Sequence, residues 1–452
     1  MRRPATIIGC TLFAAAIAAS LLVRQHGHLA LAGTGGRGAI ADRALEASEL
    51  ELLDRDIAFF ADRARRDTLG ALDRASLAAL YLQRARLTGN GDDDIRAEEA
   101  ARQSLALRTV RNASTYTILA SSLLAQHRFL DAREAARELV RAEPDDPAAR
   151  ALLGEIQLEV GEYDSARVLL EPLAGMRENL AVGPRLARWA EIAGRSEDAR
   201  AIFNAALREV AERTDLLPEQ AAWFYLRRGQ LELKAGGLDG AANAFRAGLE
   251  IHPGDHRILG ALARLELLRG RPGRAIGYGE RAIAIALEPG TLGVLGDAHI
   301  ARGDSVQAKD HYRAMEVAVL AQPGAFHREW SLWLLDHGRG IDQVLAKARE
   351  EIRTRRDVYG YDLLAWALHK SGNHVEAREA AQMALRLGTR DASLYFHAGM
   401  IARALGDTAT ARRELEEALE INSYFHPTQP AVARATLDSI RHGRVQVALE
   451  VR

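Results

Sequence analysis

Two stretches of seventeen residues near the C-terminus decide the fold: YDLLAWALHKSGNHVEA, residues 361–377, and YFHAGMIARALGDTATA, residues 395–411. Both begin with tyrosine, then place a small residue four positions on, glycine seven positions later and alanine five positions further. Small side chains let two antiparallel helices approach closely, and glycine readily takes the positive φ of a tight turn between them. Each stretch is therefore typical of a helix–turn–helix unit, and the two units lie 34 residues apart.

The same spacing recurs through most of the chain. Successive first small residues lie 34, 33, 42, 34 and 33 positions apart, and a weaker copy around Ser331 and Gly338 precedes the two quoted stretches. The 42-residue interval holds about eight extra residues around 210–220, which predict a longer second helix and a loop. Pro144 and Pro253 fall where a second helix should end. A period this regular predicts a solenoid of stacked helix pairs. The first small residues are Ala120, Gly154, Ala187, Gly229, Ala263, Gly296, Ala365 and Gly399.

These positions resemble the tetratricopeptide repeat (TPR) family, whose 34-residue helix–turn–helix units carry the same signature. The resemblance spans about residues 77–423 and implies an all-α fold, a right-handed α-solenoid of about nine to ten repeats with capping helices. We assign the repeats to residues 76–423. Because open solenoid ends expose apolar faces, we assign residues 41–75 to an N-terminal capping region and residues 424–452 to a C-terminal cap and tail.

The N-terminus carries a segment typical of an exported bacterial protein. Arg2 and Arg3 precede an uncharged, mostly apolar run over residues 4–23. Two interpretations remain open: cleavage after Ala32 would release the chain, or an uncleaved helix would anchor it in the inner membrane. Both predict a periplasmic or extracytoplasmic protein that contacts the membrane only through residues 1–32. The Gly-rich residues 33–40 then form a tether.

Two motifs near this segment are rejected on physical grounds. Cys10 ends a lipobox-like sequence, but the apolar stretch before it is too short for a signal sequence. Gly33, Gly35 and Gly38 form a G-x-G-x-x-G, yet no buried strand feeds the glycines, so we predict no dinucleotide cofactor. The single cysteine also excludes a disulfide scaffold and cysteine catalysis in the body.

Charge and composition exclude further classes of protein. The chain has 60 basic and 61 acidic residues, a formal net charge of −1, which argues against a nucleic-acid partner. Hydrophobic residues make up 48% and charged residues 27%, so most of the chain should fold. Aromatics are only 6%, whereas alanine, leucine and arginine are abundant, as helical proteins favour.

No motif for metal binding or catalysis stands out. The chain has 14 histidines but no H-E-x-x-H, and Pro253 separates His252 from His256. Residues 92–94 are three aspartates without the alternating ligands of an EF-hand, and we interpret them as a solvated acidic loop. Asn112 heads a glycosylation sequon but fits a helix cap. We therefore predict no metal, no cofactor and no enzymatic activity.

Members of the family bind through a concave face built from the first helix of each pair. The positions that should face inward are Arg188, Gln230, Arg264, Asp297, Trp366, His369, Phe396, Met400 and Arg403. The C-terminal members mix aromatic, thioether and cationic side chains, which are favoured at interface anchors. Trp366 and Phe396 would equally well pack between helices. A subset of the family clamps a peptide carboxylate with lysine and asparagine, but here those positions hold residues such as Asp362 and Trp366, or Leu226 and Gln230.

The leading prediction is a non-enzymatic scaffold that presents a concave groove to a protein or peptide partner in the cell envelope. The alternative is an envelope-assembly or hydrolase-associated factor with a noncanonical site on the helical scaffold. Acidic and histidine side chains from separate repeats that converge in one closed pocket would favour the alternative. Their scattered, solvated placement would favour the scaffold.

Overall fold

The computed structural model describes residues 38–320 and 328–442, with side chains from Glu49 onward. These residues form twenty-two α-helices and one short 3₁₀ helix, and no strand occurs among them. The all-α prediction is confirmed. The predicted export segment, residues 1–32, lies outside the described residues. None of the described helices is both long and apolar enough to span a bilayer.

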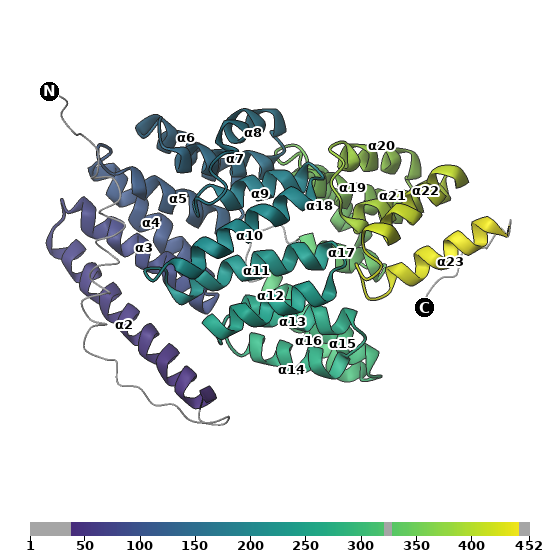
Figure 1. Ribbon diagram of the computed structural model, residues 1–452, viewed down its shortest axis with the longest axis horizontal. Coiled ribbons are helices and arrows are strands. Elements are labelled where there is room, and N and C mark those ends of the chain that lie inside the picture. The colour runs from purple at the N-terminus through teal and green to yellow at the C-terminus, as the bar shows by residue number, and fades with distance from the viewer. Residues whose placement is uncertain (1–37, 321–327, 443–452) are drawn as a thin grey trace.

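After α2 (Gly38–Arg66), the helices pair in chain order to give ten repeats (Figure 1). Repeats 1 to 5 are α3 (Ala71–Thr88) with α4 (Gly91–Leu107), α5 (Ala113–Ala125) with α6 (Phe129–Ala142), α7 (Pro147–Val160) with α8 (Tyr163–Leu170) and η1 (Glu171–Leu173), α9 (Gly183–Ile192) with α10 (Ser196–Glu212), and α11 (Pro218–Lys234) with α12 (Leu238–Ile251). Repeats 6 to 10 are α13 (His256–Leu268) with α14 (Pro272–Ile283), α15 (Pro289–Ala301) with α16 (Ser305–Leu320), α17 (Arg328–Asp336) with α18 (Ile341–Glu351), α19 (Val358–Lys370) with α20 (His374–Leu385), and α21 (Ala392–Ala404) with α22 (Thr408–Ile421). Helix α23 (Gln429–Arg441) follows the last pair.

The two kinds of signature residue do what their chemistry predicts. In repeats 3 to 10 the glycine of the turn has φ between 63° and 85°, a left-handed conformation that side chains with a Cβ disfavour. Inside the pairs, a Cβ on Gly229 would lie 2.3 Å from the Phe245 ring, and one on Gly296 would lie 2.2 Å from the Tyr312 ring. The small residues therefore permit close contact between paired helices.

The lengthened interval behaves as its spacing predicts. Helices α10 and α11 are each 17 residues long, and residues 213–217 connect them. Pro144 lies just beyond the end of α6, and Pro253 lies just beyond the end of α12. Proline cannot continue a helix without losing a hydrogen bond, so each second helix ends before it.

The prediction of a solvated acidic loop at residues 92–94 is wrong. Asn90 caps α4 by accepting a hydrogen bond from the Asp92 amide, so the three aspartates occupy the first turn of the helix. Asp93 is 1% exposed and accepts two 2.7 Å bonds from Arg84 of α3. Carboxylates stabilise a helix N-terminus, and Arg84 of the preceding helix is the ion-pair partner of the buried Asp93 carboxylate.

Two assigned boundaries fall inside helices. Helix α2 already begins at Gly38, within the stretch assigned to the tether. Helix α3 begins at Ala71 and crosses the boundary between residues 75 and 76, so the first repeat starts earlier than its sequence signature. Leu53 and Ile57 of α2 are buried against this repeat, in agreement with a capping role.

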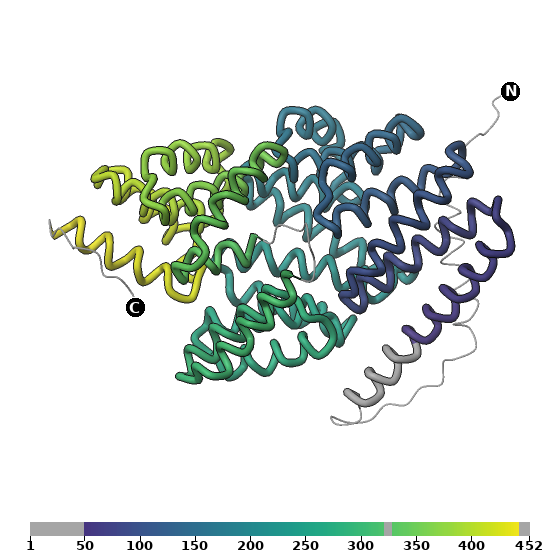
Figure 2. Tube along the Cα trace, turned by 180° about the vertical axis from the view of Figure 1, so that it is seen from behind, coloured from purple at the N-terminus to yellow at the C-terminus, as the bar shows by residue number. Residues whose placement is uncertain are grey.

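The repeats wind tightly enough for successive superhelical turns to meet (Figures 1 and 2). We call this contact the seam. It joins the turns of repeats 3 to 5 (residues 159–163, 192–194 and 233–236) to connections later in the chain (residues 355–359, 388–391 and 422). The Arg356 amide donates to the Val160 carbonyl at 3.0 Å, and the Asn422 side-chain amide donates to the Leu233 carbonyl at 2.9 Å.

Candidate partner-binding surface

All nine residues expected to face inward lie on first helices of their pairs, but their surroundings differ. Gln230 and Arg264 are exposed, whereas Arg188, Asp297, His369, Met400 and Arg403 are half-buried. Trp366 and Phe396 are only 3% and 2% exposed. The structure therefore divides the set into Arg188, which belongs to a charged group near the seam, three polar residues in repeats 5 to 7, and a C-terminal group in which Trp366 and Phe396 are buried.

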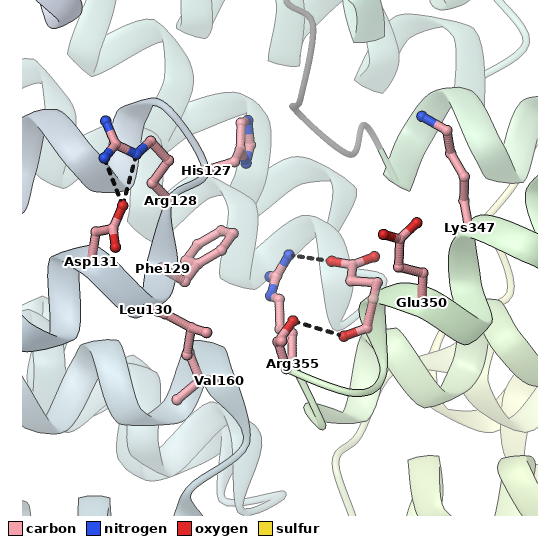
Figure 3. A pocket seen from close by; sticks show the side chains of 11 residues that line it. His127, Arg128, Phe129, Leu130, Asp131, Val160, Lys347, Glu350 and Arg355 are labelled. Carbon is pink, nitrogen blue, oxygen red and sulfur yellow. Dashed lines mark hydrogen bonds and ion pairs between the residues drawn. The ribbon is translucent and has the colours of Figure 1, made fainter.

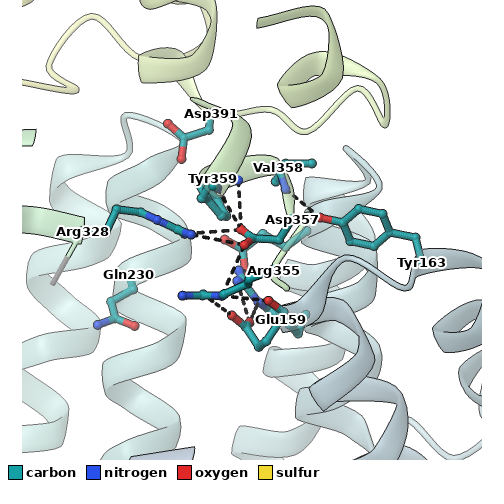
Figure 4. A network of polar contacts seen from close by, with 12 residues as sticks. Glu159, Tyr163, Gln230, Arg328, Arg355, Asp357, Val358, Tyr359 and Asp391 are labelled. Atoms are coloured by element: carbon teal, nitrogen blue, oxygen red, sulfur yellow. Dashed lines mark hydrogen bonds and ion pairs between the residues drawn. The ribbon is translucent and has the colours of Figure 1, made fainter. Parts of the chain in front are cut away.

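The charged group centres on Glu159, near the end of α7 (Figure 4). One of its oxygens lies 2.9 Å from Arg188 Nη2, and the other lies 3.2 Å from Arg355 Nη2 across the seam. Asp357 caps α19 by accepting from the Tyr359 and Gly360 amides, and it also pairs with Arg328 at 3.2 Å. Repeats 3, 4 and 8 thus meet in one network of ion pairs.

Opposite charges fix the ionisation of this network. Burial alone would raise the pKa of Glu159, but the neighbouring Arg188 and Arg355 lower this pKa to about 2. Likewise, Lys234 and Arg188 hold the pKa of Glu191 well below its ordinary value, against the effect of burial. The pKa of Lys234 is raised despite burial, chiefly by Glu191. These groups stay charged near neutral pH, which suits a structural or recognition role rather than proton transfer.

Tyr359 inserts its ring among three cations. Lys234 Nζ lies 4.8 Å from the ring centroid, and the guanidinium carbons of Arg188 and Arg328 each lie 5.7 Å from it. The Lys234 ammonium also donates to the Tyr359 hydroxyl. Cations over an aromatic face are attracted by its quadrupole, more strongly where water is excluded. The repeat signature gives no hint of this niche, because Tyr359 precedes the periodic tyrosine and its partners are distant in sequence.

Trp366, His369 and Phe396 of the C-terminal group belong to an internal aromatic stack. Trp366 packs against His397 with 4.2 Å between ring centroids and against His369 with 5.0 Å, and its Nε1 donates to Asp336 at 2.8 Å. Burial lowers the pKa of His369 to about 3, so this imidazole stays neutral. Trp366 and Phe396 therefore pack between helices, which was the alternative interpretation of these two residues. The binding role of the other seven stays a prediction.

Asp336 joins this stack to the C-terminal cap. Besides Trp366, its carboxylate accepts a 3.1 Å bond from Gln429 Nε2, at the start of α23, and lies 3.7 Å from His426 Nε2. Burial lowers the pKa of His426 to about 4, although Asp336 opposes this shift. One carboxylate of repeat 8 thus holds repeat 9 and the cap together.

Repeats 6 and 7 contribute the more accessible polar side chains. Asp297 accepts a 2.7 Å bond from the Tyr312 hydroxyl, and burial raises the pKa of its carboxyl group. Arg264 of the neighbouring first helix is exposed and near enough to oppose that shift. With Gln230, these two residues are the polar members of the predicted groove in repeats 5 to 7.

A cavity of about 510 Å³ lies beside the seam, between the turn of repeat 2 and the second helix of repeat 8 (Figure 3). Arg355 spans it, with its guanidinium carbon 4.0 Å from the Phe129 ring centroid. The wall carries both charge signs, among them Lys347 and Glu350. Such a lining suits a polar peptide segment better than an apolar small molecule. The described residues contain no group of three or more potential metal ligands.

Comparisons with known proteins agree with this architecture. Three family models described as tetratricopeptide repeat match residues 123–182, 226–288 and 392–425. No curated protein matches the sequence significantly.

Among solved structures, the chain is similar to the APC/C hetero-tetramer Cut9–Hcn1, with 14% identity over 88% of this chain and 96% of that one and a TM-score of 0.34. It is also similar to the human IFIT1 dimer with PPP-AAAA, with 18% identity over 70% and 72% and a TM-score of 0.45. A tetratricopeptide repeat protein from Parabacteroides merdae shares 17% identity over 73% and 98%, with a TM-score of 0.28. The chain has ten helix pairs and matches three repeat models, and it is therefore a member of the tetratricopeptide repeat family.

Proposed function

We propose that this protein is a non-enzymatic scaffold of the cell envelope that binds a protein or peptide partner on the first helices of its repeats. The observation that carries the proposal is the stack of ten tetratricopeptide repeats, a protein-interaction architecture. Exposed Gln230 and Arg264 offer polar contacts, and arginine is enriched at interfaces. Half-buried Met400 and Arg403 extend this surface toward the C-terminus.

The partner is sought by pull-down from a membrane fraction with mass spectrometry. We expect the double substitution Arg264→Ala and Arg403→Ala to abolish capture of the principal partner. Arg246→Ala is the matched control, because Arg246 is exposed on α12, a second helix. Undiminished capture by the double variant would remove this surface from consideration.

The envelope location rests on Arg2, Arg3 and the apolar run that follows them. Fractionation of a C-terminally tagged chain, with N-terminal sequencing, tests it. A chain that begins at Gly33 indicates cleavage after Ala32, and an intact chain in the membrane fraction indicates an anchor. An intact chain in the cytoplasm would contradict both forms of the proposal.

A further inference from the structure

Part of the surface of repeats 3 to 5, at the turns and the ends of the first helices, is covered by a later segment of the same chain. Residues 355–359 run from the connection after α18 into the first turn of α19 and lie against the end of α7 (Figure 4). Arg355 Nε donates to the Glu159 carbonyl at 2.9 Å, and the Val358 amide donates to the Tyr163 hydroxyl at 2.8 Å. The Arg356 amide also donates to the Val160 carbonyl. Residues 355–359 thus contact repeat 3 through both main-chain and side-chain groups, as a bound extended peptide does.

Two side chains of this segment enter distinct sites. The Arg355 guanidinium reaches the Glu159 carboxylate. The Tyr359 ring, four residues later, lies against Arg188 of repeat 4 and Lys234 of repeat 5, and Arg328 of repeat 8 also lies over this ring. The Tyr359 main chain belongs to the first turn of α19, so the segment carries these two groups at a fixed spacing. The face of repeats 3 to 5 is therefore complementary to a cation followed by an aromatic hydroxyl.

We propose that this face is a binding surface for a partner segment that carries an arginine and, four residues later, a tyrosine, and that residues 355–359 act as its internal competitor. The inference rests on the proposed scaffold function and names the chemistry of the partner. A segment of the same chain is present at high effective concentration, so it outcompetes a weak external ligand. The apparent affinity for the partner falls in proportion to the fraction of molecules in which the face is open.

The seam offers a matched pair of variants for opening the face. Gly161 has φ of 81°, and a Cβ there would lie 2.3 Å from the Arg356 carbonyl carbon. Gly372 occupies the same turn position in repeat 9 with φ of 85°, and a Cβ there would meet nothing within 4 Å. Alanine at either site carries the left-handed backbone strain, but only Gly161→Ala pushes residues 355–359 away.

The probe is a fluorescein-labelled peptide with the sequence of residues 353–361, RTRRDVYGY. Its binding to the full chain is measured by fluorescence anisotropy, with a scrambled peptide as the control. We expect Gly161→Ala to bind the probe about tenfold more tightly than the wild type, and Gly372→Ala to match the wild type. Adding Glu159→Gln to Gly161→Ala should reverse the gain, as should alanine in the peptide at the position of Tyr359.

Small-angle scattering and circular dichroism establish whether each variant is folded and whether the seam has opened. If Gly161→Ala does not fold, Arg355→Ala replaces it, with the exposed Arg349→Ala as its control. Equal affinities for a folded, opened variant and its control would overturn the inference, as would binding that is insensitive to Glu159→Gln. If the cellular partner is still captured in that case, the scaffold function stands and only this surface is excluded.

Discussion

The turn of repeat 2 shows how much one residue can depart from the repeat pattern. His127 has φ of 58°, in the position that glycine occupies in repeats 3 to 10. A Cβ in this conformation costs about 1–2 kcal/mol. The neighbouring Phe129 ring lies 5.8 Å from the imidazole in an edge-on contact, and both residues line the cavity beside the seam.

His127→Gly should raise the free energy of unfolding by about 1 kcal/mol, because glycine relieves the strain but adds entropy to the unfolded chain. Urea unfolding measures the change. The reciprocal control, Gly406→Ala, should lower stability by a similar amount, since φ is 78° there and a Cβ would meet no neighbour. A loss of stability in His127→Gly would show that the imidazole contacts outweigh the strain.

At the scale of elements, the pairing of first and second helices was predictable from the sequence. The stability of the fold depends on how closely the two helices of a pair approach each other. Gly229→Ala should lower the free energy of unfolding by about 1–3 kcal/mol, because the new Cβ would overlap the fully buried Phe245 ring. Gly277 of α14 is the control, since a Cβ there meets nothing within 4 Å. Gly277→Ala should raise stability by about 0.5–1 kcal/mol through helix propensity. Thermal unfolding compares the two, and a shift of the same sign in both would contradict the packing argument.

The position of α23 depends on a contact with Asp336 that the spacing of the repeat signature does not indicate. Asp336→Ala removes the acceptor of Trp366 Nε1, which should cost about 1–3 kcal/mol because a buried donor is left unsatisfied. Hydrogen exchange should accelerate in α23 through the loss of the bond from Gln429. Asp342→Ala, at an exposed position in the first turn of α18, should leave this exchange unchanged. Unaltered protection of α23 in the Asp336→Ala variant would argue against this link.

At the scale of the whole molecule, the seam joins successive superhelical turns of the solenoid, so that repeats distant in the sequence contact one another. Glu159 has a pKa of about 2 in the folded protein and an ordinary value of 4.5. A carboxylate with a lowered folded pKa stabilises the fold above its unfolded pKa, and that contribution is lost as pH falls toward the folded value. The seam should therefore weaken between about pH 4.5 and 2, by roughly 2–3 kcal/mol from this group.

Thermal unfolding at several pH values across that window measures the effect. Glu159→Gln should flatten the decline, whereas Glu350→Gln, at an exposed site, should follow the wild type. Small-angle scattering in the same window should detect a larger radius of gyration as the seam opens. A Glu159→Gln profile with the slope of the wild type would exclude this carboxylate as the source of acid sensitivity.

The helix pairs, their period and their turns follow from the sequence alone, because glycine at a left-handed turn and small residues at a close contact are local requirements that recur every 34 residues or so. The sequence also placed the candidate residues on first helices, but could not tell that Trp366 would be buried or that Arg188 would be engaged by Glu159. These outcomes depend on how separate repeats pack against one another. The seam depends on the small rotation between successive repeats, which accumulates over the stack and brings Arg355 to Glu159, 196 residues away.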